Sequence, residues 1–140
     1  MFDKGQGLFI SGSEKQISVA SQVWMILSDV VNEKEGKQIL TALSKNIDAV
    51  KPVSPYMYHY YIEALIKCGM HSEAKNLIAS YWGGMVSNGA DTFWEVYDPE
   101  NDFLSPYNSF LVNSACHAWS CTPVYFFRKY YDLLFSEPTN

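Results

Sequence analysis

Cysteine, histidine and positive charge are all scarce in this chain. The three cysteines are odd in number, and only Cys116 and Cys121 stand close together. This usage indicates neither a disulfide framework nor a zinc knuckle, and it favours three reduced, mostly buried thiols. The three histidines are scattered and show no acid–histidine spacing. We therefore expect no metal site and no cofactor.

The shortage of basic residues argues against nucleic acid as a partner. Ten Lys and Arg residues face fifteen Asp and Glu residues, which gives a formal net charge of −5. Nucleic-acid surfaces need basic side chains to neutralise phosphates. No apolar run approaches the ~20 residues of a membrane span, so no membrane contact is expected either. The first residues lack the order of a signal peptide. The cytoplasm is the default expectation, and a start farther upstream would leave export open.

Apolar and aromatic side chains are abundant. The apolar fraction is 48% and the charged fraction is 18%, a balance typical of an ordered globular domain. At 140 residues, the chain has the length of one domain with a sizeable core. The aromatic fraction of 16% exceeds what a helical core needs. We expect some of these rings to face a ligand or a partner.

Helical periodicity predicts an all-α fold built from helical hairpins. A capping box at Ser13 and Gln16 marks the first helix start, and another at Asn32 and Glu35 marks the second. Ile47 is expected on the buried face of the second helix. We expect one α-helical domain over residues 1–140, with residues 1–12 as a loop or tail. The expected helices span residues 13–31, 32 to before 52, 54–69, about 72 to the glycines at 83–89, and 122–134.

Residues 90–114 have no helical period and form the longest predicted loop. Loops of this length are usually functional or disordered, and this one is too aromatic for disorder. It contains Phe93, Trp94 and Glu95 in sequence, directly after a glycine-rich helix end. Aromatic rings stack on the C–H faces of sugars, and a neighbouring carboxylate can accept a proton from water. The loop is therefore typical of a sugar-handling site.

Two motifs in order give this chain a family resemblance. The first is Tyr81-Trp82-Gly83-Gly84-Met85 followed by Thr92-Phe93-Trp94-Glu95, and the second is Ser114-Ala115-Cys116-His117-Ala118-Trp119-Ser120 followed by Thr122-Pro123. Together they resemble the C-terminal part of the catalytic domain in the bacterial α-L-rhamnosidases, glycoside hydrolase family 78. The resemblance covers residues 13–135. It implies an (α/α)6 toroid, of which this chain would supply about half of the helical hairpins.

The resemblance also implies an inverting glycoside hydrolase that acts on a terminal rhamnose-like sugar. It places the general base at Glu95, and the implied substrate-binding residues are Trp94, His117, Trp119, Phe93 and Tyr56. The family's proton donor lies upstream in an acid-rich segment, and no such segment precedes Ser13. We therefore expect the chain to be inactive alone. We also expect it to form a homo-oligomer or to pair with a missing upstream half, because a half ring exposes apolar helix faces.

An alternative class of function uses the same loop without catalysis. In that interpretation the chain is a helical module that binds carbohydrate or a protein partner. Glu95 would then cap a helix or pair with a basic group, and His117 would be a hydrogen-bonded structural residue. For His117, ligand contact and a structural role are equally well supported by the sequence.

Overall fold

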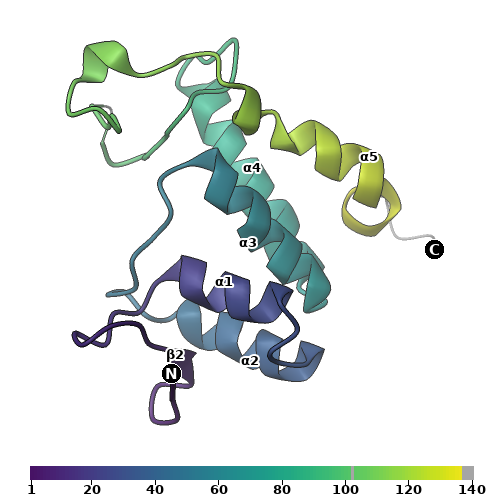
Figure 1. Ribbon diagram of the computed structural model, residues 1–140. Coiled ribbons are helices and arrows are strands. Elements are labelled where there is room, and N and C mark those ends of the chain that lie inside the picture. Colours follow the sequence, from purple (N-terminus) through teal and green to yellow (C-terminus); the bar gives the residue numbers. More distant parts are fainter. Residues whose placement is uncertain (102, 137–140) are drawn as a thin grey trace. The chain divides into compact units, whose positions relative to one another are not determined.

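The computed structural model describes residues 1–101 and 103–136 of the chain (Figure 1). Contacts between residues divide it into two compact units. Unit 1 comprises Met1–Pro52 and Tyr60–Met70, and unit 2 comprises Val53–His59 and the chain from His71 onward. Helix α3 (Pro55–Lys67) contributes residues to both units. The prediction of a single domain stays a prediction.

Residues 2–9 form a small hairpin within the segment expected to be a loop or tail. Strand β1 (Phe2–Asp3) pairs antiparallel with β2 (Leu8–Phe9), so that Phe2 lies opposite Phe9. The side chain of Gln22 accepts from the Phe9 N–H at 2.8 Å and donates to the Phe9 carbonyl at 2.8 Å. Leu8 is buried next to the helices of unit 1, and removal of this apolar surface from water stabilises the hairpin.

Helix α1 (Val19–Leu27) begins later than predicted, since its N-cap lies five residues after the expected one at Ser13. The true N-cap is Ser18, whose side chain accepts from the Ser21 N–H at 3.1 Å. The predicted capping box at Ser13 is wrong, because Lys15 adopts a left-handed φ of 51° that no α-helix contains. Residues 11 and 16 instead form an isolated antiparallel bridge.

Helix α2 (Glu33–Leu43) starts as predicted. Its capping box is complete, because Asn32 accepts from the Glu35 N–H at 3.0 Å and Glu35 accepts from the Asn32 N–H at 2.9 Å. Its buried face contains Ile39, among others, and it packs against α1 in unit 1. The prediction for Ile47 is wrong: this side chain is 87% exposed, because the helix ends four residues before it, at Leu43.

Unit 2 is organised around helices α4 (His71–Ser87) and α5 (Thr122–Leu134), which pack against each other. Helix α4 continues through Gly83 and Gly84 and ends before Gly89, whose φ of +89° stops the helix. The Trp82 indole N–H donates to the Ser120 carbonyl at 2.8 Å and ties the start of α5 to α4. Phe126 on α5 is fully buried.

Between α4 and α5 the chain is irregular, with two short 3-10 turns, η1 (Phe110–Val112) and η2 (Ala118–Ser120). Cys116 and Cys121 flank η2 and are exposed, whereas Cys68 in unit 1 is buried. The expectation of mostly buried thiols is therefore wrong for this pair, because both lie in the exposed connection rather than on a packed helix face.

The all-α prediction is confirmed. In the described residues, the regular structure is five α-helices and one sheet of two short strands. None of the helices in this part of the chain is both long and apolar enough to cross a membrane.

Candidate functional site

Backbone hydrogen bonds bring the two sequence motifs together in unit 2. The Glu95 N–H donates to the Ser114 carbonyl at 2.8 Å, and the His117 N–H donates to the Phe93 carbonyl at 2.9 Å. The Thr92 hydroxyl adds a bond to the Ala115 carbonyl. These bonds hold the segment at residues 92–95 beside the segment at residues 114–117, although about twenty residues separate them in sequence.

The far end of the first segment is anchored by Tyr97. This ring packs so closely on α4 that a Cβ at Gly84 would lie 2.6 Å from the Tyr97 hydroxyl oxygen. The Asn88 side chain donates to that hydroxyl at 3.1 Å, and the Tyr97 N–H donates to the Val53 carbonyl at 3.3 Å. Gly84, which belongs to the glycine-rich helix end of the first motif, therefore makes room for the ring that fixes the segment next to Glu95.

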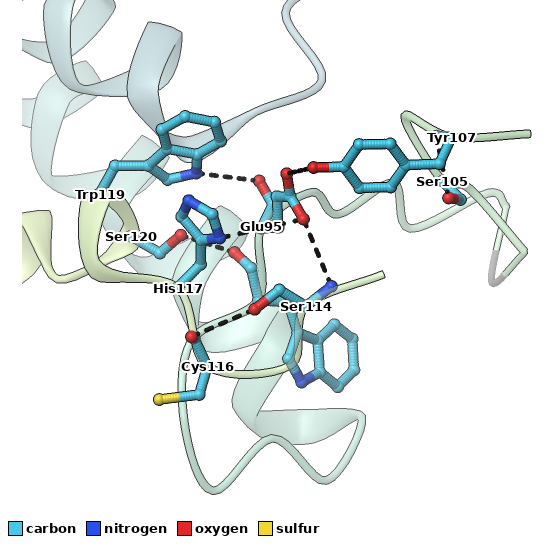
Figure 2. A network of polar contacts seen from close by, with 9 residues as sticks. Glu95, Ser105, Tyr107, Ser114, Cys116, His117, Trp119 and Ser120 are labelled. Atoms are coloured by element: carbon cyan, nitrogen blue, oxygen red, sulfur yellow. Dashed lines mark hydrogen bonds and ion pairs between the residues drawn. The ribbon is translucent and has the colours of Figure 1, made fainter. Parts of the chain in front are cut away.

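The Glu95 carboxylate is buried, with 4% of the residue exposed, and it has polar partners on both oxygens (Figure 2). Oε1 accepts from the Tyr107 hydroxyl at 2.8 Å. Oε2 accepts from the Ser114 N–H at 3.3 Å and lies 3.9 Å from His117 Nδ1. Burial of a carboxylate is costly unless such partners compensate for lost hydration. The arrangement thus maintains a polar, partly shielded acid in a fixed orientation.

Tyr107 and Glu95 are electrostatically linked. The hydrogen bond to Glu95, and the negative charge of that carboxylate, raise the pKa of the Tyr107 phenol from its ordinary 10.0. The bond holds the phenolic proton, so the phenol ionises less readily. Tyr107 itself is 56% exposed and comes from the long loop, so its hydroxyl reaches the buried acid from the solvent side.

Trp119 and His117 form an aromatic surface beside the acid. Their ring centroids are 4.0 Å apart with an interplanar angle of 40°. The Trp119 indole N–H donates to the Glu95 carbonyl at 3.3 Å, while the residue remains 44% exposed. The Tyr56 ring lies 6.0 Å from the Trp119 ring. Figure 2 shows Trp119 and His117 on one side of Glu95 and Tyr107 on the other.

The structure brings Glu95, His117, Trp119 and Tyr56 together, and it places Trp94 differently. The Trp94 ring contacts Tyr97 edge to face at a centroid distance of 5.9 Å, and Trp94 lines a separate cavity. Phe93 is half-buried and contributes its carbonyl to the pairing described above. The substrate-binding roles assigned from the sequence stay predictions for all five residues.

Sequence reasoning missed Tyr107 and Ser114 as partners of the acid. The Ser114 contact is made by a backbone N–H, which carries no sequence signal. Tyr107 is twelve residues from Glu95 in an irregular loop, so no periodicity relates the two. The high aromatic content of the loop was the only available sign that one of its rings would serve the site.

Other acids of the loop do not join Glu95 in the described structure. Asp91 is exposed, and Asp98 Oδ1 accepts from the Glu100 N–H at 2.9 Å within its own turn. The partners found for the Glu95 carboxylate, namely Tyr107, Ser114 and His117, include no carboxylic acid. Within residues 1–101 and 103–136, no group of three His, Cys, Asp or Glu side chains is arranged to hold a metal ion.

No family model and no curated protein matches the chain. A solved rhamnosidase from Klebsiella oxytoca with rhamnose bound is 48% identical, with a TM-score of 0.90 over 94% of this chain and 26% of that chain. A GH78 family rhamnosidase of Bacillus sp. GL1 is 28% identical, with a TM-score of 0.74 over 91% of this chain and 14% of that chain.

These likenesses confirm the resemblance and the all-α, glycosidase-like fold class predicted from the sequence. The chain spans about a quarter of the Klebsiella oxytoca protein and about one seventh of the Bacillus protein, as the covered shares of 26% and 14% state. By sequence and fold, the chain is related to a part of the glycoside hydrolase family 78 rhamnosidases.

Proposed function

We propose that this chain supplies part of the sugar site of an α-L-rhamnosidase-like inverting glycoside hydrolase, with Glu95 as the general base. One observation carries the proposal: a buried carboxylate is held by hydrogen bonds on both oxygens, next to the exposed indole of Trp119. The likeness to a rhamnosidase with rhamnose bound supports a terminal rhamnose-like sugar as the ligand.

In this mechanism Glu95 accepts a proton from a water molecule as the water oxygen attacks the anomeric carbon. The bond to the leaving oxygen breaks, and an acid on the other face of the sugar protonates that oxygen. The Tyr107 hydroxyl and the Ser114 N–H hold the carboxylate in one orientation, which is what a general base requires.

The rings near the acid are suited to hold the sugar. The exposed face of Trp119 can stack on pyranose C–H groups, with Tyr56 beside it. The His117 ring, half-buried against Trp119, is proposed to bind a sugar hydroxyl through its second nitrogen. Phe93, two residues before Glu95, is a further proposed contact of the sugar, whereas the Trp94 ring lines a separate cavity and would contact the saccharide there.

The proton donor is proposed to come from outside these 140 residues. In inverting enzymes the two carboxyl groups lie roughly 6.5–9.5 Å apart, which leaves room for the water. Asp91 is exposed and the Asp98 carboxylate is engaged in its own turn, so neither is oriented as a partner acid. The chain by itself is therefore proposed to be inactive.

Association is proposed to complete the site. Several apolar side chains on α5 are exposed, among them Val124, Phe127 and Tyr131. Contiguous exposed apolar side chains of this kind usually mark an interface. A second copy of the chain, or the remaining part of a rhamnosidase-like catalytic domain, would cover them.

A chimera gives the sharpest test of the proposed base. This chain would replace the matching segment of the Klebsiella oxytoca rhamnosidase, to which it is 48% identical. We expect the chimera to hydrolyse an aryl rhamnoside, and Glu95→Gln to lower kcat by roughly 10²–10⁴-fold because a general base is lost. Glu73→Gln, a change on the exposed side of α4, should leave kcat unchanged.

Two results would contradict the proposal. An active chimera whose kcat survives Glu95→Gln would remove Glu95 from the role of base. Turnover by the isolated 140-residue chain would show that the proton donor lies within it. If the chimera is folded but inactive, L-rhamnose binding by the isolated chain tests the proposed sugar site instead. Binding is followed through the Trp119 indole signal in proton–nitrogen NMR. We expect this signal to shift saturably, because the sugar-binding part of the site should still bind the sugar.

A further inference from the structure

A cavity lies in unit 2, the unit that carries Glu95. Its volume is about 280 Å³. None of the carboxylate's partners, Tyr107, Ser114 and His117, lines it. The polar and aromatic part of its wall consists of two rings, one carboxylate and three side-chain amides: Trp94, Tyr97, Asp98, Asn88, Asn101 and Asn113.

The segment at residues 94–96 borders both this cavity and the proposed catalytic site, and Glu95 lies at a bend in it. Trp94 and Val96 line the cavity, whereas the Glu95 side chain between them points to Tyr107 and His117. The same short segment therefore presents two different sets of side chains, and only one of them is used by the proposed base.

Asn113 has an unused hydrogen-bond acceptor. Its Oδ1 is buried and has no partner among the described residues, although the residue lines the cavity. Buried polar atoms in native proteins are normally paired, so an unpaired one needs an explanation. A hydroxyl group of a molecule bound in the cavity could donate to this oxygen once the amide turns about the Cβ–Cγ bond.

The lining chemistry favours a neutral, hydroxyl-rich ligand. Amides and a carboxylate pair with hydroxyl groups, and an indole offers a face for C–H groups. A phosphate is disfavoured because the lining contains no Lys or Arg. A divalent cation is disfavoured as well, because Asp98 is the single carboxylate of the lining and already accepts the Glu100 N–H.

We infer that this cavity binds one sugar unit of a saccharide, separately from the Glu95 site, with Asn113, Asn101, Asp98 and Trp94 as its contacts. The volume is near the lower end of the roughly 300–1,000 Å³ of ligand pockets, which suits a single ring. The inference rests on the proposed function only in taking a saccharide as the ligand.

Proton–nitrogen NMR of the 140-residue chain can follow both sites at once. The indole N–H of Trp94 reports on the cavity and that of Trp119 reports on the Glu95 site. The chain would be titrated separately with L-rhamnose, D-glucose and a rhamnosyl-glucose disaccharide. We expect at least one of these saccharides to shift the Trp94 signal saturably. Calcium chloride serves as a further titrant, and it should leave that signal in place.

Asn113→Ala tests the contact itself. It should raise the Kd measured at Trp94 roughly 3- to 10-fold, the range expected for one lost hydrogen bond. It should not lower the midpoint of urea unfolding, because the oxygen that it removes has no partner in the free protein. Asn101→Ala, at an exposed position of the same wall, gives a second variant if the first fails to fold. Asn76→Ala on the exposed side of α4 is the matched control.

The outcomes separate the two proposals. A shift of Trp119 without any saturable shift of Trp94 overturns the inference and leaves the proposed function standing. A shift of Trp94 alone supports the inference and counts against the proposed function. An unchanged Kd in Asn113→Ala overturns the inference, and Asn101→Ala gives the same test if the first variant does not fold. A shift of the Trp94 signal with calcium but with no saccharide overturns the inference as well.

Discussion

Contacts of single side chains fix the orientation of the proposed base, Glu95. Glu95 is buried, and its closest polar partner is the hydroxyl of an exposed tyrosine, Tyr107. This pair has a measurable consequence for titration, because a phenol that donates to a carboxylate loses its proton less readily. The stabilisation that Tyr107 gains from the bond is fully present below pH 10.0 and is lost as the pH rises through its raised pKa.

Glu95→Gln should bring the pKa of Tyr107 back toward 10.0, because the charge that raises it is removed. The measurement is the carbon chemical shift of the Tyr107 ring, followed against pH by NMR in both proteins. Glu73→Gln, which lies outside the site, should leave the Tyr107 titration as it is. An identical Tyr107 titration in the wild type and in Glu95→Gln would mean that the two groups do not interact in solution.

Two neighbouring glycines on helix α4, Gly83 and Gly84, allow a matched pair of substitutions. A Cβ at Gly84 would lie 2.6 Å from the Tyr97 hydroxyl oxygen and 3.0 Å from a ring carbon, whereas one at Gly83 would meet nothing within 4 Å. Tyr97 is buried, and Asn88 holds its hydroxyl, so the ring has little room to retreat. The two positions share the same helix and differ in packing.

Gly84→Ala is therefore expected to destabilise the protein by about 1–3 kcal/mol through overpacking. Gly83→Ala is expected to stabilise it by roughly 0.5–1 kcal/mol, because alanine is the better helix former and the space is open. Urea unfolding gives both values. Equal effects of the two substitutions would contradict the close packing of Tyr97 on α4.

Helix starts give a second comparison at this scale. Asn32 caps α2 with a complete capping box, while Ser13 has the same sequence signal and caps nothing. Asn32→Ala should cost about 1 kcal/mol of unfolding free energy, the usual value of an N-cap, and Ser13→Ala should stay within about 0.5 kcal/mol of the wild type. Thermal or urea unfolding distinguishes them, and a larger loss for Ser13→Ala would contradict the structure.

The helix start predicted at Ser13 was wrong, whereas the one at Asn32 was correct, and the tertiary structure explains the difference. At residues 13–16 the chain turns through a left-handed Lys15 and pairs residues 11 and 16, and the helix starts only after Ser18. Burial of Leu8 and the two bonds between Gln22 and Phe9 fix the N-terminal segment as a hairpin. Contacts between distant residues therefore overrode a local preference worth about 1 kcal/mol.

At the scale of the whole molecule, the exposed apolar side chains of α5 predict association. Phe127, Tyr131 and Leu133 are all close to half exposed. We expect light scattering to show a dimer or a larger assembly at micromolar concentration, because burial of such side chains on contact is favourable. The double substitution Phe127→Ser and Tyr131→Ser should shift the chain toward the monomer. A clean monomer of the wild-type chain would contradict this prediction.

Local patterns in the sequence were enough to predict the existence of the five helices, the family resemblance and the position of the acid, but not the start of α1 or the end of α2. Periodicity, the Asn32 cap and the Thr122-Pro123 start depend on interactions within a few residues, which a linear pattern records. The contacts of Tyr107 with Glu95, of Tyr97 with Gly84 and of Gln22 with Phe9 join residues that are distant in sequence. Such contacts form only when the chain packs, since burial and hydrogen-bond geometry act in space. Packing therefore decided which groups surround Glu95 and where the cavity beside it lies.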